Sequence, residues 1–193
     1  SDFSSSISGA GTFVITYTYV DVINNFSVSD NVIITVHDNP VAISNTTDVL
    51  CNGDATGSAN LSVSNGTPPY VEDWGGSDPN FLTAGTYTYI VTDSNNCSYT
   101  ASVNISEPSA LSLSVFTTDA LCYGSSDGNA STSISGGTPP YVENWFGEDP
   151  LALSSGNYIV TVTDANNCNF SSSYTINEPS VLSAVITTTD ILC

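Results

Sequence analysis

Residues 84–97 read AGTYTYIVTDSNNC, and residues 155–168 read SGNYIVTVTDANNC. Both stretches begin with β-branched and aromatic residues, which favour strands, and continue into Asp and Asn, which favour the turn of a β-hairpin. The second stretch follows the first at a distance of 71 residues, the difference between their starting positions. A hairpin signal that recurs at such a spacing is typical of a chain built from tandem β-rich repeats.

The repeat extends to both sides of these stretches. Residues 51–121 align without gaps on residues 122–192, and Cys193 stands where another copy would begin. Three further pairs of segments match: CNGDATGSA with CYGSSDGNA from residues 51 and 122, SNGTPPYVEDW with SGGTPPYVENW from residues 64 and 135, and ISEPSALS with INEPSVLS from residues 105 and 176.

The alignment predicts four parts of the chain. The first of them is recognised from AGTFVITYTYVDVINNF, which parallels the hairpin stretch and has Phe26 in the place of its cysteine. The parts are residues 1–40, the C-terminal part of a cysteine-free Ig-like domain; residues 41–108 and 109–179, two complete repeats; and residues 180–193, the start of the next repeat.

The fold class follows from the local patterns. Runs such as TYTYIVT and NYIVTVT are punctuated by Gly, Asn, Asp and Pro, and no segment shows a sustained helical period. About seven short strands in some seventy residues is the pattern of a compact Ig-like sandwich. We therefore expect an all-β chain of tandem Ig-like β-sandwich repeats, arranged as an extended rod.

Charge excludes two classes of partner. The 193 residues include 19 Asp and Glu, one histidine, His37, and neither Lys nor Arg, which gives a formal charge of −19. Nucleic-acid binding and docking to anionic lipid both depend on Lys and Arg, so neither is expected. No apolar run approaches the roughly 18 residues that cross a bilayer, so no membrane insertion is expected.

Each complete repeat has two cysteines, 46 positions apart. The simplest pairing joins Cys51 to Cys97 and Cys122 to Cys168, and leaves Cys193 to pair within the next repeat. Metal sites favour CxxC clusters with a histidine nearby, and a catalytic thiol needs a histidine partner, so both alternatives are weaker. Structural disulfides imply an oxidising, extracellular location.

These residues resemble the SprB repeat of giant surface adhesins of gliding Bacteroidota. The pattern of that family is C-x-G-x-x-x-G, G-G-x-x-P-Y-x-x-x-W, G-x-Y-x-V-x-V-T-D-x-x-x-C and a terminal E-P or Q-P, and both complete repeats match it closely. The resemblance implies export by the type IX secretion system and display as long extracellular filaments. In some members the filaments are carried along the cell by the gliding motor and grip polysaccharide-coated surfaces.

Aromatic residues recur at equivalent positions of the two repeats. Trp74 and Trp145 follow the PPY segments, and Tyr70 and Tyr141 close those segments. Aromatic faces stack on sugar rings, so the tryptophans are candidates for a carbohydrate platform. The expectation that we favour places all four residues in the structural core, with each tryptophan packed on its disulfide as in Ig domains.

Acidic residues also recur in register. Calcium prefers several oxygen ligands, and carboxylates near the junctions between repeats are candidates for a bound cation. This candidate calcium set is Asp48, Glu107, Asp119, Glu178 and Asp190. The competing reading is solvated acids and capped turns, in which Asp93 and Asp164 hold their hairpins through Asx-type hydrogen bonds.

The function expected from these observations is structural and adhesive. The chain would be a repeat segment of a long secreted cell-surface filament, a gliding adhesin being one form of it. Its partners would be neighbouring repeats, laterally associated copies, and polysaccharide or other surface ligands. The alternative is an array of carbohydrate-binding modules with one weak sugar site per repeat. No enzyme, no catalytic residue and no cofactor other than calcium is expected.

Overall fold

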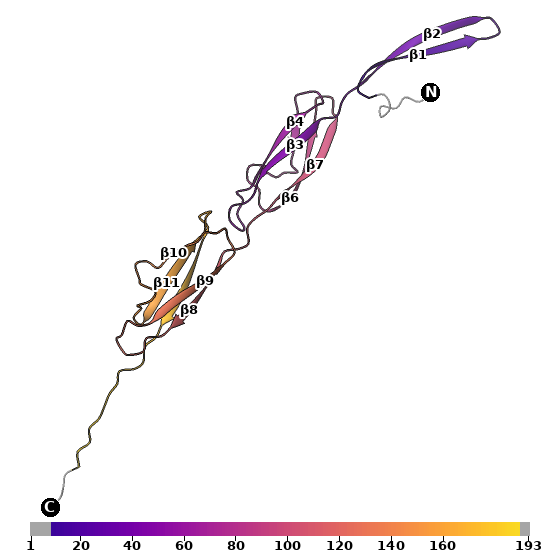
Figure 1. Ribbon diagram of the computed structural model, residues 1–193. Helices are drawn as coiled ribbons and strands as arrows, with labels where there is room; N and C mark the ends of the chain where they lie inside the picture. The colour runs from indigo at the N-terminus through magenta and orange to yellow at the C-terminus, as the bar shows by residue number, and fades with distance from the viewer. Residues whose placement is uncertain (1–8, 190–193) are drawn as a thin grey trace, which may run out of the picture. The chain divides into compact units, whose positions relative to one another are not determined.

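The computed structural model describes residues 9–189, and within that range it is all-β with antiparallel strand pairs throughout (Figure 1). The described residues divide into two compact units. The first unit comprises the residues up to 48 together with 55–106, and the second comprises 49–54 together with the residues from 107 onward. Segment 49–54 thus belongs to the second unit, although the strands on both sides of it belong to the first.

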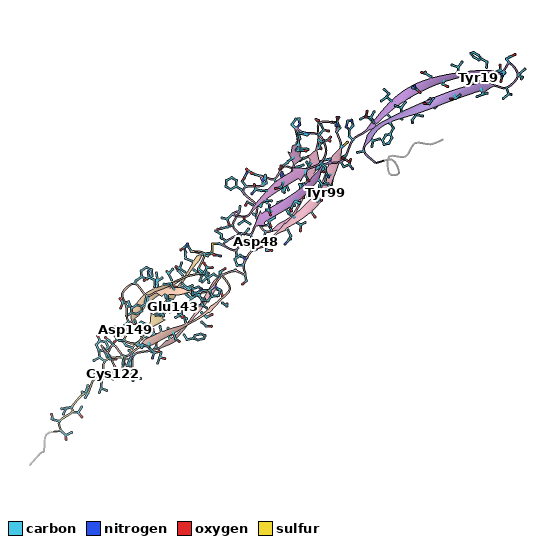
Figure 2. The ribbon with its side chains drawn as sticks, turned by 45° about the horizontal axis from the view of Figure 1, so that its top comes forward. Tyr19, Asp48, Tyr99, Cys122, Glu143 and Asp149 are labelled. Carbon is cyan, nitrogen blue, oxygen red and sulfur yellow. A yellow bond between two sulfur atoms is a disulfide. The ribbon has the colours of Figure 1, made fainter. Side chains whose placement is uncertain are left out.

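The first unit begins with a long β-hairpin. Strand β1 (Gly11–Asp21) pairs along its whole length with β2 (Phe26–Val36). The Asp21 carboxylate accepts hydrogen bonds from the amides of Ile23 and Asn24, which closes the turn. Most side chains of both strands are exposed, including Tyr19 (Figure 2).

The first complete repeat follows this hairpin. It contains a two-stranded sheet of β3 (Val41–Thr47) and β4 (Ser58–Ser64) and a three-stranded sheet of β5 (Val71–Asp73), β6 (Gly85–Thr92) and β7 (Ser98–Ile105). Strand β3 contacts β7, so the two sheets pack on one another.

The second repeat has the same elements in the same order. Strands β8 (Ser112–Thr118) and β9 (Asn129–Ser135) form one sheet, and β10 (Val142–Asn144), β11 (Gly156–Thr163) and β12 (Asn169–Ile176) form the other. Its core draws on both sheets and comprises Leu113, Ala130, Leu153, Val160, Val162, Tyr174 and Ile176. A core shared by two sheets is a small β-sandwich, so the predicted fold class is confirmed.

The number of strands differs from the prediction. Each repeat has five strands rather than about seven. The stretches between β3 and β4 and between β5 and β6 form turns, and they pair at an isolated bridge between Gly57 and Leu82, repeated as Gly128 and Leu153. Their Gly, Asp and Asn residues favour turns over continuous strands. The extended-rod arrangement and the four-part division stay predictions.

Candidate functional site

The cysteines pair between repeats. Cys51 is bonded to Cys168, across 117 positions of sequence, and their Cα atoms are 5.7 Å apart. Both residues belong to the second unit. The predicted pairs Cys51–Cys97 and Cys122–Cys168 are therefore wrong, and Cys97 and Cys122 are free. Cys193 and its predicted pairing lie outside the described residues.

The reason lies in the connection between β3 and β4. This connection carries Cys51, and its residues 49–54 pack with the second repeat instead of the first. The Leu50 carbonyl accepts a hydrogen bond of 2.9 Å from the Asn166 side-chain amide, two residues before Cys168. The free Cys122 lies in the equivalent connection, between β8 and β9 (Figure 2).

Cys168 is positioned by a buried aspartate in its own hairpin. Asp164 accepts hydrogen bonds from the amides of Thr138, Asn166 and Cys168, at 2.8, 2.8 and 2.9 Å. Burial raises the pKa of the Asp164 carboxyl, but these three amides outweigh burial and hold the pKa below its usual value. The predicted Asx-type role of this aspartate is confirmed.

Asp93 plays the same part in the first repeat. Its carboxylate accepts the amides of Thr67, Asn95 and Cys97 at 2.9 Å each. Burial again acts to raise the pKa and the amide hydrogen bonds outweigh it, so that the pKa of Asp93 is lowered. The free Cys97 therefore sits on the same hairpin scaffold as the bonded Cys168.

The turn that follows the other cysteine of each repeat is held by the glutamate of the E-P segment. Gly53 donates its amide to Glu107 at 2.6 Å, and Gly124 donates to Glu178 at the same distance. Both glycines have a positive φ, 83° and 75°, which favours glycine over other residues. The first glycine of the C-x-G motif is thus a backbone donor in a turn beside the cysteine.

The second glycine of that motif is required by packing. A Cβ on Gly128 would lie 2.6 Å from the Cγ2 atom of Ile176 and 2.9 Å from the Leu153 carbonyl oxygen. A Cβ on Gly57 would likewise lie 2.7 Å from the Cγ2 atom of Ile105 and 2.8 Å from the Leu82 carbonyl oxygen. These glycines let the isolated bridge approach the last strand of each repeat.

The candidate calcium ligands are hydrogen-bonded to backbone amides. Asp48 (Figure 2) accepts the amide of Ser106 at 2.8 Å, and Asp119 accepts that of Asn177 at 2.8 Å. Glu107 and Glu178 bind the glycines already described. Within residues 9–189 no three His, Cys, Asp or Glu side chains gather closely enough to hold a metal ion. Asp190 lies outside the described residues, and calcium at this set stays a prediction.

The two tryptophans differ in exposure. Trp74 is buried, at 7% exposed, and packs against Tyr89 with ring centroids 5.0 Å apart. Trp145 is half-buried and packs edge-on against Tyr174 at 6.0 Å. Neither Cys51 nor Cys168 belongs to the core cluster that Trp145 joins, so the expected packing of that tryptophan on a disulfide is not found.

Tyr70 and Tyr141 are structural residues. Both are half-buried, and Tyr141 joins the core of the second repeat. Their hydroxyls donate at 2.6 Å to the carbonyls of Asn65 and Gly136, five residues earlier. Each tyrosine thereby closes the G-x-P-P-Y loop on itself.

Sequence reasoning missed an aromatic groove in the second repeat. Its lining residues are Trp145, Phe146, Glu148, Asn157, Tyr158 and Ile159, around a cavity of about 310 Å³, and this set is called the aromatic groove below. Phe146 is 63% exposed and has a φ of 57°, a left-handed conformation that is costly for an aromatic residue. The alignment of the two repeats could have indicated this site, because the first repeat has Gly75 where the second has Phe146.

The first repeat lacks several of the residues that line the aromatic groove. Gly75, Ser77 and Thr88 stand where the second repeat has Phe146, Glu148 and Ile159. The motif residues that the two repeats share form turns, cores and cysteine supports.

The comparisons with known proteins agree with the repeat. The family model of the SprB repeat matches residues 43–74 and 114–142, one segment in each complete repeat. No curated protein matches the chain at a significant level. In the described part of the chain, no helix is long and apolar enough to cross a membrane. The SprB repeat is associated with cell-surface, adhesin-like proteins, and the two matches are consistent with a chain that carries SprB repeats.

Proposed function

We propose that this chain is a structural and adhesive segment of a long extracellular filament, in which SprB repeats succeed one another and hold the filament together. The observation that carries the proposal is the disulfide from the opening cysteine of one repeat, Cys51, to the closing cysteine of the next, Cys168. Such a bond needs an oxidising compartment. It also adds a covalent cross-link between successive repeats beside the backbone, which suits a filament that bears load.

The chain's charge supports an exposed location. With 19 acidic residues and neither Lys nor Arg, the surface is solvated and offers no site to trypsin-like proteases. The finer parts of the proposal are type IX export, transport by a gliding motor and lateral association of copies. Neither catalysis nor nucleic-acid binding nor membrane insertion is part of it.

An adhesion assay tests this function. Beads that carry the full chain are allowed to settle on glass coated with a panel of bacterial and plant polysaccharides, and the force or shear that detaches them is measured. The proposal expects retention on at least one coating, above the retention of beads that carry the reduced and alkylated chain. Calcium and EDTA arms show whether a cation contributes. Equal retention of folded and unfolded chains on every coating would contradict an adhesive role.

A second candidate function is carbohydrate binding, and the aromatic groove favours it. Exposed aromatic faces beside carboxylate and amide groups are the elements that bind sugar rings, and Glu148 and Asn157 supply the polar groups. A hydrogen bond of 2.9 Å from the Phe146 amide to the Asn144 side chain holds its left-handed turn, but the exposed ring at this position is not accounted for by packing. The site would be particular to the second repeat rather than present once in every repeat.

The variant Phe146→Gly separates binding from folding. It installs the residue of the first repeat, so we expect the free energy of unfolding to stay within about 1 kcal/mol of wild type, because the relief of strain offsets the entropy of glycine. Binding to a polysaccharide that the chain retains should fall at least severalfold. Phe116→Asn is the matched control, because Phe116 is also exposed and Asn45 is its counterpart. Equal losses in both variants would argue against the groove.

A further inference from the structure

We infer that Cys122 and the apolar surface around it form a docking site for the closing hairpin of the SprB repeat that follows, and that a disulfide seals this contact. The occupant is a Thr-Asp-x-Asn-Asn-Cys hairpin like the one that ends at Cys168. The inference concerns how repeats join one another and does not depend on adhesion or sugar binding.

A single pairing rule accounts for all four described cysteines. Cys51 opens the first repeat and is bonded to Cys168, which closes the second. Under this rule Cys97, a closing cysteine, needs an opening cysteine in the preceding part, and residues 1–50 contain none. Cys122, an opening cysteine, needs the closing cysteine of a repeat beyond the second. Both free cysteines are thus the ones whose partners the rule places outside the two complete repeats.

The surface beside Cys122 matches the one that Cys51 already uses. Around the existing bond, Cys51, Ala110, Leu111 and Cys168 line one cavity. Around Cys122, the lining residues are Leu121, Tyr123 and 179–182, and Val181 and Leu182 are the counterparts of Ala110 and Leu111. The second cavity therefore has the opening cysteine and the following segment but lacks a closing hairpin.

The residues that follow the second repeat provide an independent observation. Leu111 and Val115 pack against the core of the second repeat. Their counterparts, Leu182 and Ile186, are 96% and 89% exposed. Apolar side chains that are partly buried against a core in one copy and exposed in the next form a surface that a further sandwich would cover.

The covalent step is an oxidation. The thiols of Cys122 and of the incoming closing cysteine lose two protons and two electrons and form one S–S bond. A disulfide oxidant of the glutathione class accepts them and leaves as two thiols. In a series, each loop would overlap the next, because the loop closed by Cys51 and Cys168 already contains Cys122. A stretch of chain inside a closed loop could then not be pulled straight by force without breaking its disulfide.

The test lengthens the chain by one repeat. Residues 1–192 are followed by a second copy of residues 122–192, with Ala165→Ser in the added copy so that its closing hairpin is distinguishable. After oxidation with glutathione disulfide, the cysteines are mapped by alkylation and mass spectrometry of unreduced peptides. We expect Cys122 to lose its reactivity and to pair with the closing cysteine of the added copy, while Cys51–Cys168 persists.

Every other outcome overturns the inference. Cys122 left free, Cys122 bonded to Cys97, or an added copy that closes on its own opening cysteine would each do so. A second variant tests the apolar surface itself. Leu182→Ser in the lengthened chain should slow formation of the Cys122 bond severalfold, whereas Leu151→Ser, at an exposed leucine outside this surface, should not. Equal rates in the two variants would show that the surface does not dock the hairpin.

Discussion

Asp164 supports Cys168 through three amide hydrogen bonds, and this arrangement makes stability depend on pH. Its pKa is lowered in the folded chain, so its contribution is complete above the unfolded pKa of about 4 and is lost as pH falls through the folded pKa. We expect Asp164→Asn to destabilise the chain at pH 7, because an amide group cannot accept from all three donors. The difference from wild type should shrink toward pH 3.

Urea unfolding between pH 3 and pH 7 measures this effect. Asp38→Asn is the control, since it removes the same charge from an exposed side chain. A constant difference between wild type and Asp164→Asn over the whole range would contradict the proposed role of the ionised carboxylate.

Tyr174 carries a buried hydroxyl that has no hydrogen-bond partner among the described residues. Its ring stacks on Tyr158 with centroids 5.5 Å apart, and burial raises the pKa of its phenol. We expect Tyr174→Phe to raise the free energy of unfolding by about 1 kcal/mol, because it removes the desolvation cost of an unpaired hydroxyl. Tyr158→Phe should lower it by roughly the same amount, because the Tyr158 hydroxyl donates to the Ser154 carbonyl. Chemical denaturation of both variants checks the opposite signs.

At the scale of the strands, sequence predicted what depends on local pattern. The hairpins of residues 84–97 and 155–168 appear as β6–β7 and β11–β12, and their turns are closed by Asp93 and Asp164 as expected. The strand count was wrong because glycine-rich segments form turns and a single bridge. Local propensity cannot distinguish such segments from short strands.

The candidate site was less predictable than the fold. The spacing of cysteines does not reveal that segment 49–54 packs with the following repeat, because that choice is made by contacts distant in sequence. The aromatic groove was missed because it depends on residues that the two repeats do not share, Phe146 above all. Shared residues alone do not reveal such a site.

The bridge between Gly128 and Leu153 tests how closely these elements pack. We expect Gly128→Ala to destabilise the chain by about 1–3 kcal/mol, because the new methyl group overlaps Ile176 and the Leu153 carbonyl. Gly156→Ala is the matched control, because its Cβ would come no closer than 3.4 Å to Tyr158. Equal destabilisation of the two variants, measured by urea unfolding, would mean that the close approach at Gly128 is not what selects glycine.

At the scale of the whole molecule, the disulfide decides which parts of the chain stay joined when the backbone is cut. The bond from Cys51 to Cys168 closes a loop that includes the connection between the two repeats. Bonds within each repeat, from Cys51 to Cys97 and from Cys122 to Cys168, would leave that connection outside every loop. A single cut at residue 109 therefore distinguishes the two arrangements.

The absence of Lys and Arg makes such a cut possible, because Ser109→Arg creates the only trypsin site in the chain. The free thiols are first blocked by alkylation, and the protein is then unfolded in urea and digested without reductant. We expect residues 1–109 and 110–193 to migrate as one species until a reductant separates them, because Cys51 and Cys168 lie on opposite sides of the cut. Ser29→Arg is the control, since a cut before Asp30 lies outside the loop and releases a fragment without reduction. Two fragments from Ser109→Arg before reduction would mean that no disulfide joins the two repeats, and the cross-link proposed for the filament would fail with it.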